Sequence, residues 1–547
     1  MSSVSSRWST SSVGSTRRGA PGCRGGRAPR PAPGDPHPRL TGRPGPSSSR
    51  VADGVTERAG TVHLVVAPPA GDGHPGRLKC ATSLDIERGG DVPEHVARAR
   101  RLRPRTLLIS SVTTVALVAG VAGVATGQDP APATPYPREE RWAPTPIPDR
   151  VVLTPTETPA TSQAVSWRTS NDVETAQAQI VETLPGPSET LNGPRLAQLA
   201  DTVPAAESTS IQADLGYMTQ FHTAVFEGLE PDTSYLYRVG DGANWSEWYE
   251  FSTAVDGFAP FSFIYVGDAQ NNIEEHVSRV FRRAFAGADD PSLFLHAGDL
   301  IDVADRDWEW GEWFEAGGFI NGMINTLATP GNHEYRSGNL SPQWRPQFSF
   351  PSNGPTEALD EVVYYVDYQG VRFVSIDSNR RSNGELQIQA DWLDEVLSDN
   401  PNRWTVVFNH HPIFSVSQGR NEVNWRNAML PVIERHGVDL VLQGHDHSYG
   451  RGNVSSRETR SGRSHDGPVY VVSVSGPKMY QVSGSVWSDN NATLRSTAEN
   501  TQLYQYIDVD RNELRYEARD ATGAFHDGFT IRKQDNGRRT VTDVFGG

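Results

Sequence analysis

Side chains that bind divalent metal ions recur in the middle of this 547-residue chain, each time directly after a run of β-type residues. The segments that carry them are Gly267–Gln270, Gly298–Asp302, Gly331–Glu334, Val407–His410 and Gly444–His447. In chain order they supply an aspartate, a second aspartate, an Asn-His pair, a histidine and a His-x-His pair. Carboxylate, amide and imidazole ligands in this order indicate a hydrolytic site with two metal ions.

Each segment is weak evidence alone, and the ordered set carries the interpretation. A Gly-Asp pair, as at Asp268 and Asp299, most often marks a turn. A carboxylate between two metal ions can bridge them at about 3.5–4 Å, and Asp299 is our candidate for that bridge. His445 and His447 are two positions apart, so on an extended segment both side chains point the same way, and each suits a different ion.

Two pairs of adjacent residues divide their roles in a similar way. Asn332 offers a neutral amide oxygen to a metal ion, whereas His333 points to the substrate side. The alternative for that pair is a capping asparagine and a surface histidine. His410 and His411 point in opposite directions on an extended segment, so one binds metal while the other supports the site or the core.

Strand-like and helix-like patterns alternate from Phe261 onward. The strand-like runs are Phe261–Val266, Leu293–His296, Val371–Ile376, Thr405–Phe408, Val438–Leu442 and Val469–Val474. The helical patterns are Glu274–Phe285, Leu386–Leu397 and Trp425–His436. This alternation predicts an α/β domain with largely parallel central strands. Ligand sites in such sheets gather at the carboxyl ends of the strands, where the metal-binding segments begin.

An all-β pattern precedes this domain, from Asp149 to about Ala254. Alternating strands at Val151–Thr154, Ala164–Thr169 and Trp248–Thr253, with turn residues between them, predict a β-sandwich of about 100 residues. The stretch Leu229–Val239, with its Leu-x-Pro-x-Thr-x-Tyr-x-Tyr spacing, resembles a fibronectin type III strand and the turn before it.

The ordered metal-binding segments resemble those of the calcineurin-like metallophosphoesterase superfamily. With a β-sandwich in front, the chain is most similar to the purple acid phosphatase branch, over about 385 residues from 149 to 533. The resemblance implies a fibronectin type III-like domain at 149–255. It also implies a four-layer α/β sandwich at 256–535, with a dinuclear metal centre between the tops of two sheets.

The same resemblance implies a ligand set and a mechanism. The first ion would take Asp268, Asp299 and His447, and the second would take Asp299, Asn332, His410 and His445. A metal-bound hydroxide would be the nucleophile. His333 would be the catalytic residue that protonates the leaving oxygen or stabilises the transition state.

The chain departs from the family pattern at two positions. Purple acid phosphatases have a tyrosine three residues after the second aspartate, where this chain has Asp302, so the protein should lack the purple colour. The wider superfamily has a histidine two residues after the first aspartate, where this chain has Gln270. Gln270 either binds the first ion through its amide oxygen or is only structural. The metal identities stay open among Fe, Zn, Mn, Mg and Ca, because oxygen ligands favour harder ions.

Several further residues are weaker candidates. His411, Tyr449, Arg451 and Lys478 follow the ligand segments and could line a substrate pocket, as could Tyr480. A basic side chain near the ions would help to hold a phosphate oxygen. The aromatic and acidic stretch Trp308–Phe314 predicts a helix packed on the sheet, with a substrate-facing wall as the alternative.

The N-terminal region differs from the rest in charge and composition. Residues 1–105 carry 18 Arg and Lys against eight Asp and Glu, a formal charge of +10, and predict a disordered tail or a start codon assigned too early. Residues 106–126 are apolar and follow a basic cluster, which predicts a secretion signal or a membrane anchor. A Pro- and Ala-rich linker at 127–148 and a short tail at 536–547 complete the predicted organisation.

Charge and cysteine usage exclude some functions. The whole chain has a formal charge of −16, so residues 106–547 carry −26, which argues against nucleic acid as the main partner. The only cysteines are Cys23 and Cys80, so a thiolate metal site in the body is excluded. We expect an extracytoplasmic enzyme that acts on small phosphate esters, and the sequence does not indicate its oligomeric state. The alternatives are a phosphodiesterase or nucleotide pyrophosphatase, and a surface binding module with a degenerate metal site.

Overall fold

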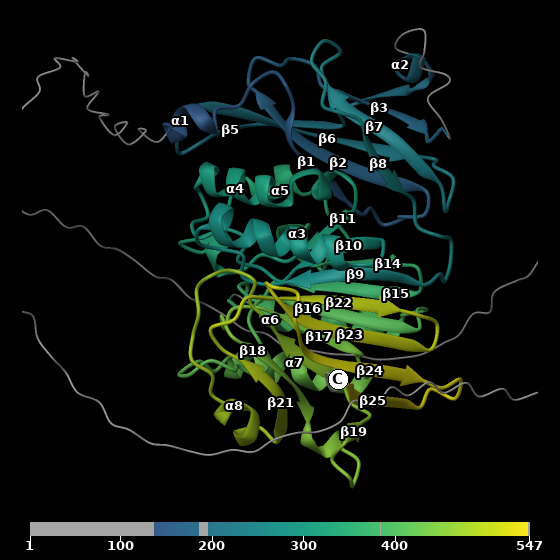
Figure 1. Cartoon of the computed structure of the whole chain (residues 1–547), viewed down its shortest axis with the longest axis vertical. Coiled ribbons are helices and arrows are strands. Elements are labelled where there is room, and N and C mark those ends of the chain that lie inside the picture. Colours follow the sequence, from purple (N-terminus) through teal and green to yellow (C-terminus); the bar gives the residue numbers. More distant parts are fainter. Residues whose placement is uncertain (1–135, 185–194, 383, 545–547) are drawn as a thin grey trace, which may run out of the picture. The chain divides into compact units, whose positions relative to one another are not determined.

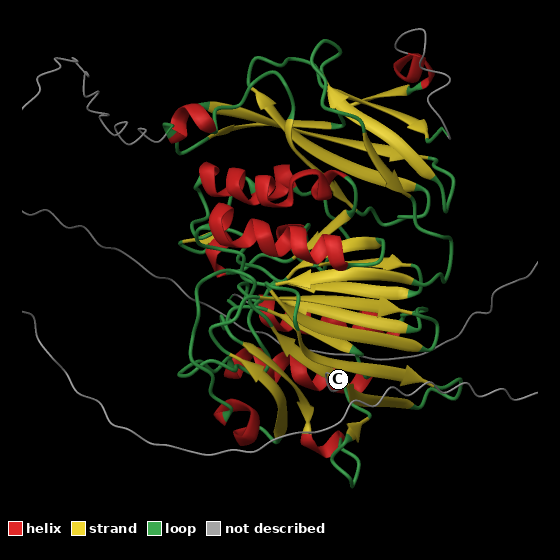
Figure 2. Ribbon diagram, in the orientation of Figure 1, coloured by secondary structure: helices red, strands yellow, loops and turns green. Residues whose placement is uncertain are grey.

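The computed structural model describes residues 136–184, 195–382 and 384–544 (Figures 1 and 2). The predicted basic tail at 1–105 and the apolar segment at 106–126 lie outside the described residues. Within the described part, no helix combines the length and the apolar character needed to cross a membrane. The described residues form a β-sandwich followed by an α/β domain.

The first domain consists of two antiparallel four-stranded sheets. One sheet has the strand order β1 (Asp149–Thr154), β2 (Ser162–Ser170), β6 (Met218–Glu227), β5 (Glu207–Gln212). The other has the order β4 (Asp201–Pro204), β3 (Gln177–Glu182), β7 (Ser234–Gly240), β8 (Tyr249–Ser252). Buried aromatic side chains from both sheets meet between them, including Trp167, Phe226 and Tyr237. The predicted β-sandwich is therefore confirmed.

The segment before the sandwich packs on the α/β domain. It contains helix α1 (Arg138–Arg141) and then Trp142, which is buried against Gly311 of helix α4 (Asp307–Gly317). A Cβ atom on Gly311 would lie 2.3 Å from the Trp142 ring, so this contact requires glycine. Arg141 also pairs with Glu315 at 2.8 Å. The prediction of an extended linker is wrong from residue 136 onward, because Trp142 packs on α4 and Arg141 forms an ion pair with it.

The α/β domain contains two sheets. The eight-stranded sheet has the order β11 (Asn325–Ala328), β10 (Pro291–His296), β9 (Phe261–Val266), β22 (Leu503–Val509), β23 (Glu513–Asp520), β24 (Phe525–Lys533), β25 (Arg539–Val544), β19 (Ser464–His465). The seven-stranded sheet has the order β14 (Tyr364–Tyr368), β15 (Val371–Ile376), β16 (Trp404–Asn409), β17 (Leu440–Gln443), β20 (Val469–Val472), β18 (Tyr449–Val454), β21 (Ala492–Ala498). The strands that precede the metal-binding segments pair in parallel within each sheet.

Helices cover the outer faces of the two sheets. Helix α3 (Ser278–Gly287), which continues the π-turn Ile273–Val277, lies with α4 on the side of the eight-stranded sheet (Figure 1). Helices α6 (Glu385–Ser398) and α7 (Val423–His436) lie on the side of the seven-stranded sheet. The predicted helices are found to within a few residues, and α4 is the helix predicted at Trp308–Phe314. The layer order of helices, sheet, sheet and helices confirms the predicted fold.

Side chains between the two sheets hold them together. The Phe263 ring of β9 packs edge-on against the Phe373 ring of β15, with the centroids 5.2 Å apart. The Tyr364 hydroxyl of β14 donates to the Ala328 carbonyl of β11 at 2.8 Å. The Gln443 backbone N–H of β17 donates to the Tyr265 hydroxyl of β9 at 3.0 Å. The last two bonds lie at strand ends, so they hold the two sheets in fixed relation where the metal-binding segments begin.

The C-terminal boundary differs from the prediction. Residues Arg539–Val544 form strand β25, which pairs antiparallel with β24 and buries Val541 completely. The predicted tail at 536–547 is therefore wrong up to residue 544, because its Thr-Val-Thr-x-Val alternation completes the sheet.

Candidate metal centre

The two sheets bring the carboxyl ends of five strands to one place. Strands β9, β10 and β11 end just before Asp268, Asp299 and Asn332. In the other sheet, β16 ends beside His410, and β17 ends just before the His445–His447 segment. Since the strands in each group run parallel, the segments that follow them leave the sheets at the same edge. All six predicted Asp, Asn and His ligands lie there.

The backbone at four of these ligands adopts the left-handed conformation. The φ angle is 48° at Asp268, 52° at Asp299, 76° at His445 and 48° at His447. Non-glycine residues adopt this conformation at a cost of about 1–3 kcal/mol, and such residues cluster at functional sites. The chain thus turns sharply at each strand end, which directs the side chain back across the edge of the sheet.

The donor atoms predicted for the second ion converge on one point. His410 Nε2 lies 3.1 Å from Asp299 Oδ2, 3.2 Å from Asn332 Oδ1 and 3.1 Å from His445 Nδ1. Two imidazole nitrogens, a carboxylate oxygen and an amide oxygen suit a divalent transition metal. The structure brings together the whole ligand set predicted for this ion.

The donor atoms predicted for the first ion form an adjoining group. One ligand atom from each of Asp268, Asp299 and His447 lies within 4.8 Å of the others. All three side chains are buried. Asp299 belongs to both groups, which is the position that a bridging carboxylate requires.

Gln270 lies between two of these ligands and is completely buried. Its Nε2 atom is 3.1 Å from Asp299 Oδ2 and 2.8 Å from His447 Nε2, and its Oε1 atom has no hydrogen-bond partner. An amide can turn over in place, which would direct the unpaired oxygen toward the two ligand atoms. A buried, unsatisfied oxygen beside carboxylate and imidazole ligands fits a metal ion.

Backbone carbonyls orient the histidine ligands. His410 Nδ1 is 3.0 Å from the Ala297 carbonyl, and His447 Nδ1 is 3.0 Å from the Lys478 carbonyl. A histidine that donates one ring N–H to a carbonyl presents the other nitrogen unprotonated to a metal ion. Both rings therefore present Nε2 to the centre.

Glu334 is a positioning residue that sequence reasoning missed. Its buried carboxylate accepts four backbone N–H groups, from Asp299 at 2.9 Å, Leu300 at 2.8 Å, Ile301 at 3.2 Å and Gly331 at 2.7 Å. It thereby fixes the loop of the bridging aspartate against the loop of Asn332. The signal was its place in the Gly-Asn-His-Glu segment, but only the fold shows which loop it binds.

Burial and mutual charge perturb the acid–base groups of the centre. Burial raises the pKa of Asp268 well above its ordinary value, and the charge of Asp299 adds to this. Burial alone would raise the pKa of Asp299 and lower that of His410, but their contact shifts both in the opposite direction. The buried carboxylates therefore favour a positive charge beside them, which a bound metal ion would supply.

His333 lies beside the two donor groups rather than among them. Its Nδ1 atom contacts the Asp302 carbonyl and lies 3.5 Å from the Asp302 carboxylate, while Nε2 lies 4.0 Å from Asp299 Oδ2. The side chain is partly exposed and lines an open hollow of about 560 Å³ together with Asn332, Arg306 and Arg336. This hollow gives solutes access to the edge of the centre.

Comparison with known proteins agrees with this geometry. Residues 261–449 match the family model described as calcineurin-like phosphoesterase, and residues 148–253 match the purple acid phosphatase N-terminal domain. The chain therefore contains a calcineurin-like metallophosphoesterase domain preceded by a purple acid phosphatase N-terminal domain. This class of enzyme is a metal-dependent phosphoesterase with a dinuclear site.

Curated relatives are 25–27% identical to this chain over the aligned residues. Acid phosphatase type 7 of Danio rerio is 25% identical over 58% of this chain and 78% of its own length. Purple acid phosphatase 23 of Arabidopsis thaliana is 27% identical over 46% of this chain and 61% of its own length. Probable inactive purple acid phosphatase 9 of the same plant is 25% identical over 46% of this chain and 45% of its own length. The chain thus spans 45–78% of the length of these relatives.

Two solved structures share the fold. The purple acid phosphatase from yellow lupin (Lupinus luteus) seeds superposes with a TM-score of 0.58 and 16% identity, over 71% of this chain and 75% of its own. PhoD superposes with a TM-score of 0.50 and 13% identity, over 73% of this chain and 93% of its own. At these identities the likeness concerns the fold.

Two predicted substrate-binding residues lie near the phosphoesterase centre. The His411 ring lies 4.2 Å from the His445 ring. Its Nδ1 atom forms a hydrogen bond with Ser378 Oγ at 2.9 Å. Its neighbour His410 faces the metal ligands, so the two rings divide their roles as predicted. Lys478 lies beside His447 through the carbonyl contact described above, and its side chain is partly exposed.

The prediction that Tyr449 and Arg451 line the substrate pocket is wrong. Both belong to strand β18 and are buried, at 0% and 2% exposure. The Tyr449 hydroxyl donates to Asp527 at 2.7 Å, and Arg451 pairs with Asp527 and Asp543 at 2.6 and 2.8 Å. They join two sheets by a buried ion pair, because the chain leaves the centre as soon as it enters β18.

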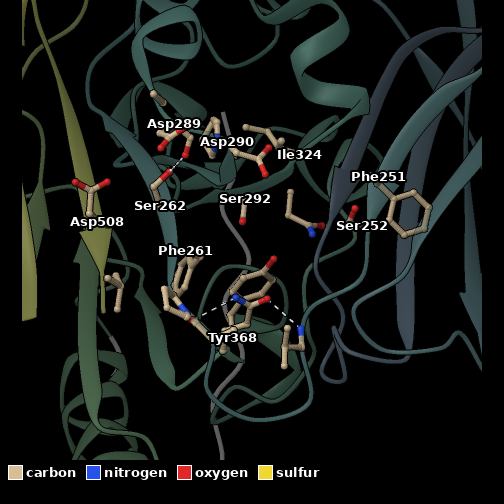
Figure 3. Close-up of a pocket in the computed structure, with 18 of the residues that line it drawn as sticks. Phe251, Ser252, Phe261, Ser262, Asp289, Asp290, Ser292, Ile324, Tyr368 and Asp508 are labelled. Atoms are coloured by element: carbon tan, nitrogen blue, oxygen red, sulfur yellow. Dashed lines mark hydrogen bonds between the residues drawn. The ribbon is translucent and has the colours of Figure 1, made fainter. Parts of the chain in front are cut away.

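A hollow with about twice the volume of the one beside His333 lies away from the metal centre. Its volume is about 1180 Å³, and it lies at the amino ends of β9 and β10, between those strands and the β-sandwich (Figure 3). Phe251, Phe261 and Tyr368 line it together with several carboxylates, among them Asp289 and Asp508. None of the predicted site residues lies there. Size alone would therefore have indicated the wrong place for catalysis.

Replacing Gln270 by alanine should weaken binding of the first ion and spare the second. The reason is that Gln270 contacts His447 and Asp299 but neither Asn332 nor His445. Replacement by histidine should keep two ions and favour zinc or iron, because imidazole suits those metals. Metal content after dialysis against a weak chelator measures the effect. Two ions per chain in Gln270→Ala would show that the residue is only structural.

Proposed function

We propose that this chain hydrolyses phosphate monoesters at a dinuclear metal centre held by Asp268, Gln270, Asp299, Asn332, His410, His445 and His447. The observation that carries the proposal is the sharing of Asp299 between two adjoining groups of donor atoms at the carboxyl ends of the strands. Two bound ions would supply the positive charge that polarises a phosphate ester and would lower the pKa of water.

The residues of the chain complete the chemistry around the ions. The Asp302 carbonyl holds His333 through Nδ1, so Nε2 is directed toward Asp299 and the open hollow. A group at that place can give a proton to the leaving oxygen of a bound ester. The Asp302 carboxylate lies 3.5 Å from the same Nδ1 atom, so Asp302 acts as a positioning residue for the ring.

Replacing His333 by alanine should leave both ions bound and lower turnover by about 10²–10⁴-fold, the usual contribution of a general acid. Asp302→Asn should lower turnover less, because the backbone carbonyl of residue 302 still holds the His333 ring. Elemental analysis together with steady-state rates across pH checks both variants. Loss of metal from His333→Ala, with unchanged activity per remaining ion, would contradict this role.

The metal pair is proposed to come from Fe, Zn, Mn, Mg and Ca, because the first ion has mostly oxygen ligands. Asp302 stands where the resemblance requires a tyrosine, so the iron-loaded protein should lack the purple tyrosinate-to-iron absorption. Elemental analysis of the purified chain, paired with activity after reconstitution with each metal, would identify the pair.

A comparison of two synthetic substrates tests the activity. The metal-loaded chain should hydrolyse p-nitrophenyl phosphate faster than bis-p-nitrophenyl phosphate. Faster release from the diester would favour the phosphodiesterase or nucleotide pyrophosphatase alternative. Two bound ions without turnover of either substrate would favour a binding module, the alternative suggested by a relative named as probably inactive.

We also propose that the enzyme works outside the cytoplasm on small phosphate esters; the negative charge of residues 106–547 argues against nucleic acid as the main partner. The basic cluster and the apolar run at 98–126 support export. A chain that starts at Val92 should therefore be exported as well as the full chain. Its retention in the cytoplasm would show that residues 1–91 are required.

A further inference from the structure

The β-sandwich reaches the hollow beside His333. Asp214, from the turn between β5 and β6, lines this hollow together with residues 302–306 of the α/β domain. Residues 302–306 connect the loop of the bridging Asp299 to helix α4, and they include Asp302, whose carbonyl holds the His333 ring. The β-sandwich therefore belongs to the surroundings of the proposed proton donor.

The turn that carries Asp214 is fastened to the first residue of α4. The Asp214 carboxylate accepts the Asp307 backbone N–H at 3.0 Å, and the Tyr217 hydroxyl donates to the Asp307 carboxylate at 2.6 Å. The turn itself is closed by the Ala213 N–H, which donates to the Tyr217 carbonyl at 2.9 Å. The first N–H groups of a helix have no partner within the helix, and Arg306, which precedes α4, supplies no side-chain cap. A residue of the β-sandwich thus satisfies the first N–H of α4.

Glu309, in the first turn of α4, holds the peptide that orients His333. Its side chain is buried, and its Oε2 atom accepts the backbone N–H groups of Asp302 and Val303 at 2.8 Å each. Its Oε1 atom pairs with Arg306 at 2.7 Å. The Val303 N–H belongs to the same peptide as the Asp302 carbonyl that contacts His333 Nδ1. In a planar trans peptide the N–H and the carbonyl point in opposite directions, so a carboxylate that fixes one also fixes the other.

The orientation of the His333 ring determines whether its Nε2 atom can reach a leaving oxygen. The backbone of His333 is fixed separately, because its N–H donates to Asp299 at 2.9 Å. The carbonyl of residue 302 therefore controls what remains, which is the direction of the ring. Proton transfer requires a heavy-atom distance of about 2.6–3.2 Å, and a displacement of about 1 Å can lower a rate by about 10²-fold.

We propose that Glu309 and Asp214 are positioning residues for the proton donor, so that the β-sandwich, through the start of α4, helps to set how well His333 protonates the leaving oxygen. The inference rests on the proposed function, in which His333 gives that proton. In this step water supplies the oxygen that bonds to phosphorus, and the bond from phosphorus to the leaving oxygen breaks. The electron pair of that bond stays on the leaving oxygen and takes the proton from His333 Nε2. The ring then regains a proton from the solvent.

Two aryl esters that differ in their need for a proton provide the test. The p-nitrophenolate ion leaves readily without a proton because its nitro group stabilises the negative charge, whereas phenolate leaves less readily. The leaving-group ratio is kcat for phenyl phosphate divided by kcat for p-nitrophenyl phosphate, measured on the metal-loaded chain. In Glu309→Ala this ratio should fall by about 10–100-fold, with KM for both esters little changed, because the misplaced ring acts in the transition state. A merely structural role would lower kcat for both esters equally.

The Asp214 turn is exposed, so its variants test the inference even if Glu309→Ala folds poorly. Asp214→Ala should lower the leaving-group ratio in the same direction but by less, because Asp214 acts on the first residue of α4 rather than on the 302–303 peptide. Asp214→Asn keeps an oxygen that can accept the Asp307 N–H and should retain the wild-type ratio. Glu315→Ala is the matched control on α4, because that half-exposed side chain pairs with Arg141, and it should leave the ratio unchanged.

A double variant shows whether Glu309 acts through the ring. His333→Ala alone should lower the leaving-group ratio, and adding Glu309→Ala should lower it no further, because the two residues belong to one chain of contacts. A further fall in the double variant, equal losses for both esters, or a ratio in Asp214→Asn as low as in Asp214→Ala would overturn the inference. An unchanged ratio in both Glu309→Ala and Asp214→Ala, beside a lowered ratio in His333→Ala, would overturn the inference alone. An unchanged ratio in His333→Ala would instead refute the proposed proton donor, and the inference with it.

Discussion

Asp299→Ala should lose both metal ions and lower phosphatase turnover by at least about 10³-fold, since each 1.36 kcal/mol of lost transition-state stabilisation costs a factor of ten. Asp299 is the side chain shared by the two donor groups, at 3.1 Å from His410 Nε2 and within 4.8 Å of Asp268 and His447. Its other oxygen accepts the His333 backbone N–H at 2.9 Å, so the variant also loosens the proposed proton donor.

Metal analysis after gel filtration measures this effect directly. Asp394→Ala is a matched control, because Asp394 is an exposed carboxylate on α6 that pairs with Arg435 far from the centre. That variant should retain two ions and full turnover. Thermal unfolding of the metal-free proteins separates loss of ligand from loss of fold. Two ions per chain in Asp299→Ala would contradict the bridging role.

The second large effect concerns the contact between the β-sandwich and the α/β domain. Asp307→Ala should lower the free energy of unfolding by about 3–5 kcal/mol, the usual cost of leaving buried charges without their partner. Asp307 begins α4, is fully buried, and pairs with Arg150 at 2.8 Å and Arg168 at 3.0 Å, both from the sandwich. It also accepts the Tyr217 hydroxyl at 2.6 Å. Removing the carboxylate leaves the buried Arg150 guanidinium without a carboxylate partner, while Arg168 keeps only its pair with Asp149 at 2.6 Å.

Denaturant titration of this variant should be compared with that of Asp394→Ala, which removes only solvent-exposed contacts with Arg435 and His436 and should change stability little. The pH dependence gives a second check. Burial alone would raise the pKa of Asp307, but Arg150 and Arg168 lower it below the ordinary value. A carboxylate with a lowered pKa stabilises the fold above its unfolded pKa of about 4, and this contribution is lost as pH falls. The loss of stability on acidification should be smaller in Asp307→Ala than in the wild-type protein. Equal losses in these two proteins would contradict the assignment.

The sequence predicted the centre well because its ligands follow strands whose residue patterns are strong. Six ligand positions could be read from short segments at strand ends, and the parallel arrangement then required them to converge. The direction in which the side chains of a strand face explains why the substrate-pocket prediction for Tyr449 and Arg451 is wrong. They follow His447 closely, but the chain enters β18 at Tyr449, and both side chains point into the contact between the sheets. Proximity in sequence to a ligand does not determine which way a strand faces.

Other features depend on contacts between distant segments and carry no local signal. Glu334 was part of a recognised segment, but its role follows from four backbone groups on two loops. Arg420 lies ten positions after His410 in a polar loop, and only the anchoring by Asp446 brings it beside His445. The prolines at 127–148 predict a linker, but Trp142 of this segment packs on Gly311. In each case a tertiary contact overrides what composition suggests.

The left-handed backbone at Asp268, Asp299, His445 and His447 restricts which amino acids evolution can place at these positions. Asparagine and glycine tolerate that conformation, whereas valine and isoleucine do not, because a branched β-carbon collides with the backbone. A descendant that abandoned metal chemistry would therefore tend to carry asparagine or glycine at these four sites rather than aliphatic residues. The fold would persist in such a lineage, and the substitution pattern would record the turns that catalysis once required.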